Sequence, residues 1–282
     1  MTEVELMAPA KINLALDVIG IRPDGYHDVR MIMQSISLAD QIFIKRTFSE
    51  SRVTSSAANI PLDRDNIAMK AWLLMKSRFG LPGELAIHIE KKIPVAAGLA
   101  GGSTNAAAVL KGVNMLFNLN LMNSQLAKIG AELGADVPFC VFGGTALAEG
   151  IGEILTPLPS PPKIWLCLVN PGYGISTAKI YQQFDSVNVD RHPDISGVVK
   201  AINTGNTRLI MEKLLNVLEN VTLSIYPELV NIKSRLSEMG LFPLMSGSGP
   251  TILGLAETED KVLQAASELS GKWKLVWTAH TI

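Results

Sequence analysis

A run of small residues between Pro94 and Asn105 is the segment of this sequence best suited to hold a chain of phosphates. It reads PVAAGLAGGSTN and leads from a predicted strand into a predicted helix. Glycines let a backbone approach a ligand closely, and the free N–H groups at the start of a helix attract an anion. The segment therefore predicts a phosphate site, although a tight strand-to-helix turn capped by Ser103 would use the same residues.

Hydroxyl groups in this segment could also serve a metal ion. Ser103 and Thr104 can bind a phosphate oxygen or a magnesium ion, which prefers hard oxygen ligands. Ser103 is the candidate magnesium ligand, and no acidic residue identifies a second one. The segment is not a Walker A loop, because no Gly-Lys-Ser/Thr follows it, and the sequence contains no G-x-G-x-x-G, H-E-x-x-H or G-x-S-x-G motif.

Two charged residues, Lys11 and Asp136, stand alone in apolar stretches of the sequence. Burial of an unpaired charge is unfavourable, so each must be paired or functional. They are interpreted either as a catalytic pair or as a structural ion pair that ties two strands together. Asn13 follows Lys11 by two residues and would lie on the same face of an extended strand.

Two pairs of residues stand out by type and spacing. Tyr26 and His27 follow an Asp-Gly turn signal and form an exposed aromatic pair. Thr177 and Tyr181 are four residues apart, which places them on one face of a predicted helix. Without a ligand, the first pair would be solvated rings on a turn, and Tyr181 a half-buried helical residue.

The first half of the chain is predicted to be rich in strands, and the helices that follow carry one apolar face each. An Asp-Asn pair can cap the first helix, and Gly80 ends it. The expected strands are Ile12–Ile19, Val29–Leu38, Gln41–Arg46 and Leu85–Glu90, and the expected helices are Asn66–Phe79, one from about Gly102, and Ser124–Leu133.

A proline-rich stretch, TPLPSPP at residues 156–162, is predicted to be a stiff connector outside any sheet. It divides the chain into an expected N-terminal ATP-binding domain, residues 1–158, and a C-terminal domain, residues 159–282. The order of elements predicts an α+β fold with helices packed on mixed sheets. The second half is expected to contain strands at Ile164–Val169, Thr251–Leu255 and Lys274–His280, and helices at Thr177–Phe184, Arg208–Leu218, Pro227–Met239 and Glu259–Leu269.

Composition excludes several classes of protein. The 282 residues include 25 Lys and Arg against 26 Asp and Glu, a net charge of -1, and no basic stripe that would bind nucleic acid. The two cysteines, Cys140 and Cys167, lie in apolar runs and are expected to be reduced core residues of a cytosolic protein. No signal peptide or membrane span is predicted. We expect a cytoplasmic protein, monomeric or weakly dimeric, with neither nucleic acid nor membrane as a partner.

Three segments in order resemble the signatures of the GHMP kinases, which include galactokinase, homoserine kinase, mevalonate kinase and phosphomevalonate kinase. They are residues 8–14 (APAKINL), residues 94–104 and residues 244–251 (LMSGSGPT). The resemblance implies a two-lobed α+β kinase fold that uses ATP and Mg²⁺. Alanines replace three glycines that many members carry in the second segment. The implied ATP-binding residues are Pro94, Val95, Ala96, Ala97, Gly98, Leu99, Ala100, Gly101, Gly102, Ser103 and Thr104.

Three more segments narrow the resemblance. Residues 22–27 (RPDGYH), 134–139 (GADVPF) and 148–153 (AEGIGE) are similar to GHMP kinases that phosphorylate a cytidine-diphosphate-linked polyol in the non-mevalonate route to isoprenoid precursors. This implies phosphoryl transfer from ATP to the 2-hydroxyl of the polyol. The alternatives are a GHMP kinase for another small alcohol, such as homoserine or mevalonate, and a kinase-fold sensor without catalysis.

The same resemblance implies roles for individual residues. Asp136 would receive the proton of the substrate hydroxyl, and Lys11 would keep that carboxylate ionised. Phosphoryl transfer needs mainly positioning and charge stabilisation, so the sequence leaves open whether Asp136 is a true base or only orients the hydroxyl. The cytosine would lie between the rings of Tyr26 and Tyr181, and His27 would offer it a hydrogen-bonding edge. The implied substrate-binding residues are Asn13, Tyr26, His27, Asp136, Thr177 and Tyr181.

Overall fold

A computed structural model describes all 282 residues, which form two compact units. Unit 1 comprises residues 1–10, 38–95 and 100–143, and unit 2 comprises residues 11–37, 96–99 and 144–282. The division crosses the chain several times because strands β1 (Glu3–Ile21) and β2 (His27–Thr47) each contribute to both units. Each compact unit consists of three separate segments of the chain, so the units do not correspond to two consecutive domains. The domain boundary near residue 158 stays a prediction.

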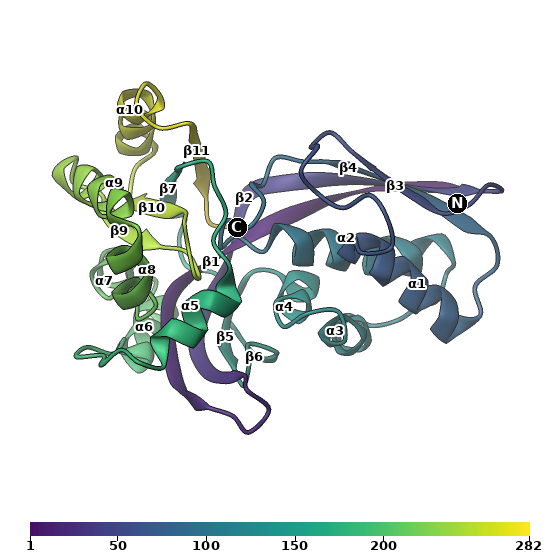
Figure 1. The fold of residues 1–282 in the computed structure, drawn as a ribbon, viewed down its shortest axis with the longest axis horizontal. Coiled ribbons are helices and arrows are strands. Elements are labelled where there is room, and N and C mark those ends of the chain that lie inside the picture. Colours follow the sequence, from purple (N-terminus) through teal and green to yellow (C-terminus); the bar gives the residue numbers. More distant parts are fainter. The chain divides into compact units, whose positions relative to one another are not determined.

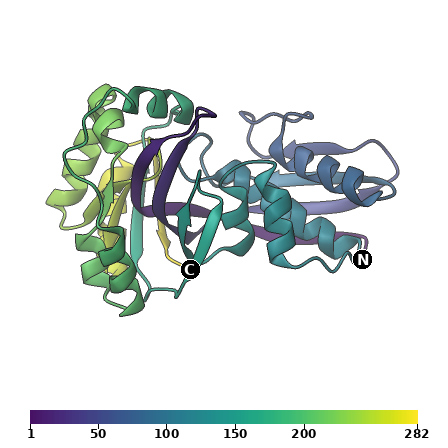
Figure 2. The same ribbon diagram turned by 90° about the horizontal axis from the view of Figure 1, so that it is seen from below.

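Unit 1 combines a sheet with helices that cover it. Figure 1 shows α1 and α2 along one face of strands β3 and β4, and Figure 2 shows the same layer from a second side. The apolar faces of these helices and strands form one core, in which Trp72 is fully buried. Besides the outer parts of β1 and β2, the unit contains β3 (Arg52–Ser55), α1 (Ile67–Phe79), β4 (Glu84–Glu90), α2 (Gly101–Leu116), α3 (Asn123–Ala131) and α4 (Val137–Phe142).

Unit 2 contains a four-stranded antiparallel sheet in the order β11-β7-β10-β9, on which α9 and α10 pack. Unit 2 also contains residues 11–37, the end of β1 and the beginning of β2. In this part β1 pairs with β8 and β2 pairs with β5. Its elements are β5 (Thr145–Glu149), β6 (Ile154–Leu158), β7 (Trp165–Asn170), α5 (Thr177–Phe184), α6 (Ile195–Asn203), α7 (Thr207–Glu212), β8 (Leu215–Asn216), α8 (Glu219–Ile225), α9 (Pro227–Glu238), β9 (Phe242–Met245), β10 (Ile252–Ala256), α10 (Glu259–Ser270) and β11 (Leu275–His280).

The predicted helix at residues 66–79 is confirmed together with both of its ends. The Asn66 side chain accepts a hydrogen bond from the backbone N–H of Ala68, and Gly80 ends α1 in the left-handed conformation. Helix α5 spans the predicted residues 177–184. Both units combine helices with a sheet, which confirms the α+β fold. None of the helices has the length and apolar character needed to cross a lipid bilayer.

The predicted break between two strands at residues 38–41 is wrong. Val29–Leu38 and Gln41–Arg46 are parts of the single strand β2, because no glycine or proline interrupts them. The charged residue between them, Asp40, is fully buried, and its carboxylate accepts hydrogen bonds from neighbouring elements. A buried charge that is fully bonded can remain inside a strand.

The prediction that residues 156–162 lie wholly outside a sheet is also wrong. Residues 154–158 form β6, which pairs antiparallel with β5 and places Pro157 opposite Ala146. Strand β6 bonds to β5 alone and is therefore an edge strand. A proline is tolerated there because its missing N–H costs no interior hydrogen bond.

The predicted helix Arg208–Leu218 ends early. Helix α7 stops at Glu212, and the short strand β8 then pairs parallel with β1, so that Asn216 lies opposite Leu16. The Asn216 side chain donates hydrogen bonds to two backbone carbonyls of the 244–251 segment, 2.9 and 2.7 Å away. These long-range contacts outweigh the local helical pattern.

Candidate active site

The residues of the predicted phosphate segment, called the nucleotide loop (residues 94–104), are divided between the two units. Pro94, Val95 and residues 100–104 belong to unit 1, and residues 96–99 belong to unit 2. Helix α2 begins at Gly101 with no side-chain cap, and Ala100 precedes it in the left-handed conformation with φ 54°. The first N–H groups of this helix are therefore left for a ligand.

Ser103 does not cap this helix, contrary to the turn that was the structural alternative. It lies inside the first turn of α2 and is half-buried. The Thr104 hydroxyl donates to the backbone carbonyl of Pro9 over 2.7 Å, and Thr104 is only 1% exposed. Of the two hydroxyls, that of Ser103 is thus the one better placed to meet a ligand, and the role of Thr104 in ATP binding stays a prediction.

A buried carboxylate ties the start of α2 to two strands of unit 1. Asp40 accepts from the backbone N–H groups of Lys92 and Ile93, both at 2.8 Å. Its other oxygen accepts from the Asn105 amide at 2.7 Å and from the Lys91 ammonium at 2.5 Å. Burial lowers the pKa of Lys91, and the charge of Asp40 partly opposes that shift.

The Lys91 ammonium lies directly beneath the first residue of α2. A Cβ placed on Gly101 would lie 2.8 Å from Lys91 Nζ and 3.0 Å from the Ile93 side chain. Only glycine fits at this position without displacing the ammonium. The sequence analysis missed Asp40 and assigned no role to Asn105, although a lone Asp within an apolar strand is the same signal that singled out Asp136.

In unit 2 the middle of the nucleotide loop packs against the 244–251 segment. The Ser246 hydroxyl donates to the carbonyl of Gly98 over 2.9 Å. A Cβ on Gly98, whose φ is +75°, would lie 2.1 Å from the carbonyl oxygen of Ser246. The backbone N–H of Ile175 also donates to the carbonyl of Ala96, at 3.3 Å. These contacts fix the path of residues 96–99.

Lys11 and Asn13 share one face of β1, as predicted. Lys11 is 5% exposed, and its ammonium donates to the Asn13 side-chain oxygen over 2.9 Å. Asn13 is fully buried, and its amide contacts the sulfur of Met31 at 3.0 Å. The backbone N–H of Lys11 donates to the carbonyl of Leu99, so the strand that carries Lys11 is bonded to the nucleotide loop.

Asp136 lies in unit 1, at the N-cap position of α4. It is half-buried, and the three residues that follow it are fully buried and apolar. Its carboxylate does not cap the helix. Because Lys11 belongs to unit 2, the pairing of Lys11 with Asp136 stays a prediction.

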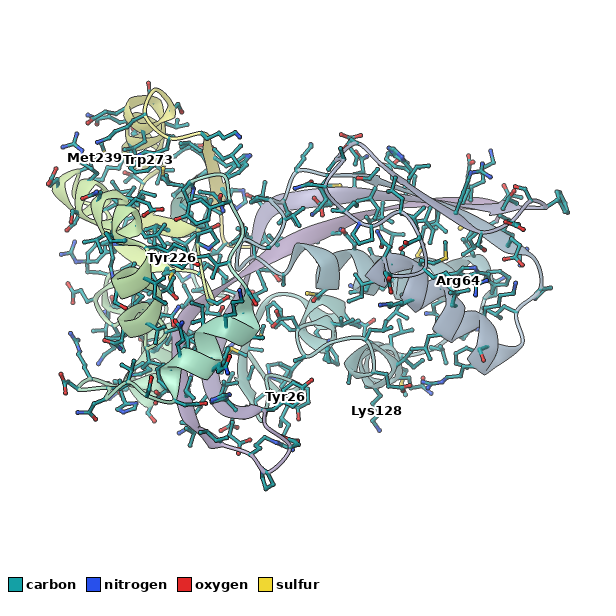
Figure 3. All side chains as sticks on the ribbon, viewed as in Figure 1. Tyr26, Arg64, Lys128, Tyr226, Met239 and Trp273 are labelled. Carbon is teal, nitrogen blue, oxygen red and sulfur yellow. The ribbon has the colours of Figure 1, made fainter.

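The ring-binding residues gather within unit 2. Tyr26 projects from the turn that joins β1 and β2 and is 60% exposed (Figure 3). The His27 ring lies 4.9 Å from the Tyr181 ring, centroid to centroid, with the planes inclined by 46°. Its Nε2 atom is 2.6 Å from a carboxylate oxygen of Asp185, a residue that the sequence analysis did not single out. The stacking of a base between Tyr26 and Tyr181 stays a prediction.

Thr177 connects the start of α5 to the 244–251 segment. Its hydroxyl and that of Ser248 are 2.9 Å apart, and the Thr222 hydroxyl donates to the Ser248 carbonyl. Thr177 and Tyr181 lie one helical turn apart, as the spacing predicts. Ser248 lies in the 244–251 segment that the sequence singles out, whereas Asn216 and Thr222 were missed because their partners are distant in sequence and no local pattern marks them.

The chain contains no group of three or more His, Cys, Asp or Glu side chains arranged to hold a metal ion. A magnesium ion that bridges the phosphates of a nucleotide does not require such a group, because it keeps several waters and takes only one or two protein oxygens. The half-buried hydroxyl of Ser103, in the uncapped first turn of α2, is compatible with that requirement.

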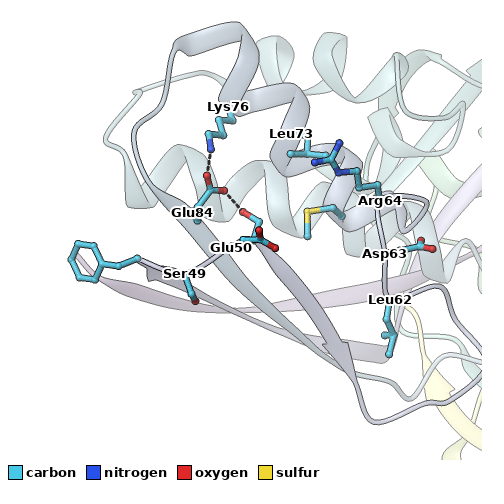
Figure 4. Close-up of a pocket in the computed structure, with 11 residues that line it drawn as sticks. Ser49, Glu50, Leu62, Asp63, Arg64, Leu73, Lys76 and Glu84 are labelled. Atoms are coloured by element: carbon cyan, nitrogen blue, oxygen red, sulfur yellow. Dashed lines mark hydrogen bonds and ion pairs between the residues drawn. The ribbon is translucent and has the colours of Figure 1, made fainter.

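A separate cavity of about 630 Å³ lies in unit 1 and includes none of the predicted site residues (Figure 4). It is lined largely by polar and charged side chains, among them Arg64, Lys76 and Glu84. Lys76 and Ser51 both donate hydrogen bonds to the Glu84 carboxylate and lower its pKa. Three of the lining residues, Ser51, Lys76 and Glu84, are thus bonded to one another.

Comparison with known proteins gives a consistent result. The chain matches the GHMP kinases N terminal domain over residues 66–144 and the GHMP kinases C terminal domain over residues 198–275. It is 47% identical to the 4-diphosphocytidyl-2-C-methyl-D-erythritol kinase of Bacillus licheniformis, with 98% of this chain and 96% of that protein aligned. It is 46% identical to the protein of the same name from Bacillus subtilis, over 98% and 96% of the two chains.

Solved structures with the same arrangement include a 4-(cytidine 5'-diphospho)-2C-methyl-D-erythritol kinase. That structure superposes with a TM-score of 0.83 at 33% identity and covers 99% of both chains. A homoserine kinase from Cytophaga hutchinsonii superposes with a TM-score of 0.78 at 16% identity, over 100% of this chain and 95% of that one. The second similarity concerns the fold alone.

Proposed function

Because this chain belongs to the GHMP kinases, and within them to the 4-diphosphocytidyl-2-C-methyl-D-erythritol kinases, we propose that it phosphorylates the 2-hydroxyl of 4-diphosphocytidyl-2-C-methyl-D-erythritol. The phosphoryl donor is ATP and the products are the 2-phosphate and ADP, a step of the methylerythritol phosphate pathway to isoprenoid precursors. The similarity to these kinases over nearly the full length carries the proposal.

ATP phosphates bind at the nucleotide loop in this proposal. The uncapped N-terminus of α2 supplies N–H groups and a positive dipole end, and the exposed Gly102 has no side chain to cover them. A bound Mg²⁺ would neutralise charge on the phosphates, with Ser103 as its candidate protein ligand. No side-chain ammonium of the loop itself is available, since residues 94–104 contain no lysine.

Asp136 accepts the proton of the 2-hydroxyl as that oxygen attacks the γ-phosphorus. Lys11 keeps the carboxylate ionised and balances charge near the reacting hydroxyl, and Asn13 holds the Lys11 ammonium through its side-chain oxygen. Most of the rate enhancement comes from positioning and from charge stabilisation, because the transition state of phosphoryl transfer is loose. The burial of Lys11 supports this role, because fixed charges act more strongly away from water.

The cytosine binds beside the turn at residues 22–27. Tyr26 and Tyr181 offer stacking faces, His27 offers a hydrogen-bonding edge, and Thr177 lies at the start of the helix that carries Tyr181. The exposed ring of Tyr26 supports this role, because a solvent-facing ring gains contact area when a base covers it. The enzyme is proposed to work in the cytoplasm as a monomer or weak dimer.

The test is an ADP-release assay with Mg·ATP and four alcohols: 4-diphosphocytidyl-2-C-methyl-D-erythritol, homoserine, mevalonate and methylerythritol phosphate without cytidine. Release with the first compound alone is expected. Turnover of another alcohol would support the assignment as a GHMP kinase but refute the proposed cytosine site. If no alcohol reacts, the chain is a kinase-fold sensor and the proposal is wrong.

A further inference from the structure

The imidazole of His27 is held by two residues of one helix face. Tyr181, in α5, packs its ring against the His27 ring, and Asp185, four residues later, places a carboxylate oxygen 2.6 Å from Nε2. The His27 side chain is 8% exposed and that of Asp185 36% exposed. Both partners of the His27 ring lie more than 150 residues away along the chain, so the fold brings them to it. Their spacing of four residues places Tyr181 and Asp185 one helical turn apart, on the same side of α5.

The carboxylate decides which nitrogen of His27 carries a proton. An ionised Asp side chain can only accept a hydrogen bond, so Nε2 must be its donor. In the neutral imidazole the other nitrogen, Nδ1, is then without a proton and acts as an acceptor. Asp185 therefore sets the hydrogen-bonding character of the opposite edge of the ring.

Stacking alone does not tell one pyrimidine from another, because each base has a π-face. The two pyrimidines differ at the edge: cytosine carries an amino group, a donor, where uracil carries a carbonyl oxygen, an acceptor. An unprotonated Nδ1 can accept a hydrogen bond from the amino group of cytosine. With uracil it would face another acceptor, the carbonyl oxygen, and no hydrogen bond could form. The edge of His27 can thus reject uracil at the position that distinguishes the two bases.

We propose that Asp185 is a positioning residue that gives this protein its preference for cytosine over uracil, by holding His27 as an acceptor toward the base. The inference rests on the proposed function, since it takes the base to be read by His27. It assigns Asp185 no contact with the substrate and no part in the phosphoryl transfer.

The experiment compares kcat/KM for the cytidine substrate with kcat/KM for its uridine counterpart in the unchanged protein, Asp185→Asn and Asp185→Ala. The unchanged protein is expected to prefer cytidine by roughly ten- to hundredfold, the effect of leaving one buried acceptor unpaired. Both variants are expected to lose most of this ratio, because an amide can either donate or accept and a methyl group does neither. The KM for ATP should stay unchanged.

Asp190→Asn is the matched control, since Asp190 is an exposed carboxylate five residues away that contacts Asn188 and no ring. It is expected to keep the full cytidine preference. An unchanged protein that uses both substrates equally, or Asp185 variants that retain the preference, would refute the inference. A loss of preference in Asp190→Asn equal to that in the Asp185 variants would also refute it.

A second measurement reads the proton position without any substrate. Nitrogen-15 spectra of the imidazoles, assigned among only four histidines, should show His27 protonated at Nε2 in the unchanged protein and a mixture of both tautomers in Asp185→Ala. Identical His27 spectra in the two proteins would contradict the role of Asp185. If the unchanged protein fails to turn over the cytidine substrate, the proposed function fails, and the spectra still test the tautomer separately.

Discussion

At the scale of single residues, the nucleotide loop depends on positions where a side chain has no room. Gly98 combines a left-handed backbone with a carbonyl oxygen 2.1 Å from where its Cβ would lie. Neither problem can be relieved by rotating a side chain, because the obstacle is backbone. Ala96 and Ala100 adopt similar left-handed conformations, with φ of 52° and 54°, so these two alanines hold a backbone conformation that glycine favours.

Gly98→Ala is expected to lower the free energy of unfolding by about 2–4 kcal/mol, from backbone strain and overpacking together. It should also raise the KM for ATP, since residues 96–99 must move away from Ser246. Thermal unfolding and steady-state kinetics measure the two effects. Gly20→Ala is the control, because a Cβ there meets nothing within 4 Å and φ is not positive. Equal stability of the two variants would contradict the prediction.

At the scale of elements, Asp40 joins β2, the segment that follows β4 and the start of α2 through four hydrogen bonds. Replacement of a carboxylate in such a cluster leaves an unpaired ammonium in the core, because Lys91 is itself only 6% exposed. The nucleotide loop lies between two of the elements that Asp40 connects. Its position therefore depends on a residue outside every motif.

Asp40→Asn is expected to reduce the free energy of unfolding by about 3–5 kcal/mol, as when a buried pair loses one partner. Urea unfolding followed by circular dichroism would measure the loss. Glu212→Gln breaks the exposed pair with Arg208 and should cost less than about 1 kcal/mol. Similar losses in the two variants would show that the Asp40 cluster contributes no more than a surface ion pair.

Helices with strong end signals could be predicted from the sequence, and so could the positions of residues along them. Asn66 and Gly80 bound α1, and the spacing of Thr177 and Tyr181 placed both on one turn of α5. Strands β6 and β8 could not be predicted, because their partners lie elsewhere in the chain and their own residues resemble a connector and a helix. Asp185 could not be predicted for the same reason, because its role depends on its contact with His27, which is distant in sequence.

At the scale of the whole molecule, chemical access to the core depends on unfolding. Cys167 lies in the central sheet of unit 2 and is fully buried, and burial raises the pKa of its thiol to about 12 from 9.0. A thiol whose pKa is raised on folding contributes stability below its unfolded pKa. That contribution is lost as the pH rises from about 9 toward 12, where the unfolded chain releases its proton first.

Iodoacetamide at pH 8 is expected to modify Cys167 at least about a thousandfold more slowly in the native protein than in denaturant, because reaction requires opening of the sheet. Peptide mass spectrometry after timed quenching would measure both cysteines at once. Cys140 is only half-buried and should react faster than Cys167 in the native protein. Equal native rates at the two thiols would contradict the burial of Cys167.

The division of β1 and β2 between the two units has a consequence for how the chain is made. Unit 1 has all its residues once position 143 has left the ribosome, whereas residues 11–37 of unit 2 gain their partners in stages. Residues 31–34 of β2 can pair with β5 once residue 148 has been made, and residues 15 and 16 of β1 pair with β8 later. Ile36 pairs with Thr281, and the N–H of Ile282 donates to the carbonyl of Ser35, so this part of β2 is completed more than a hundred residues after β5.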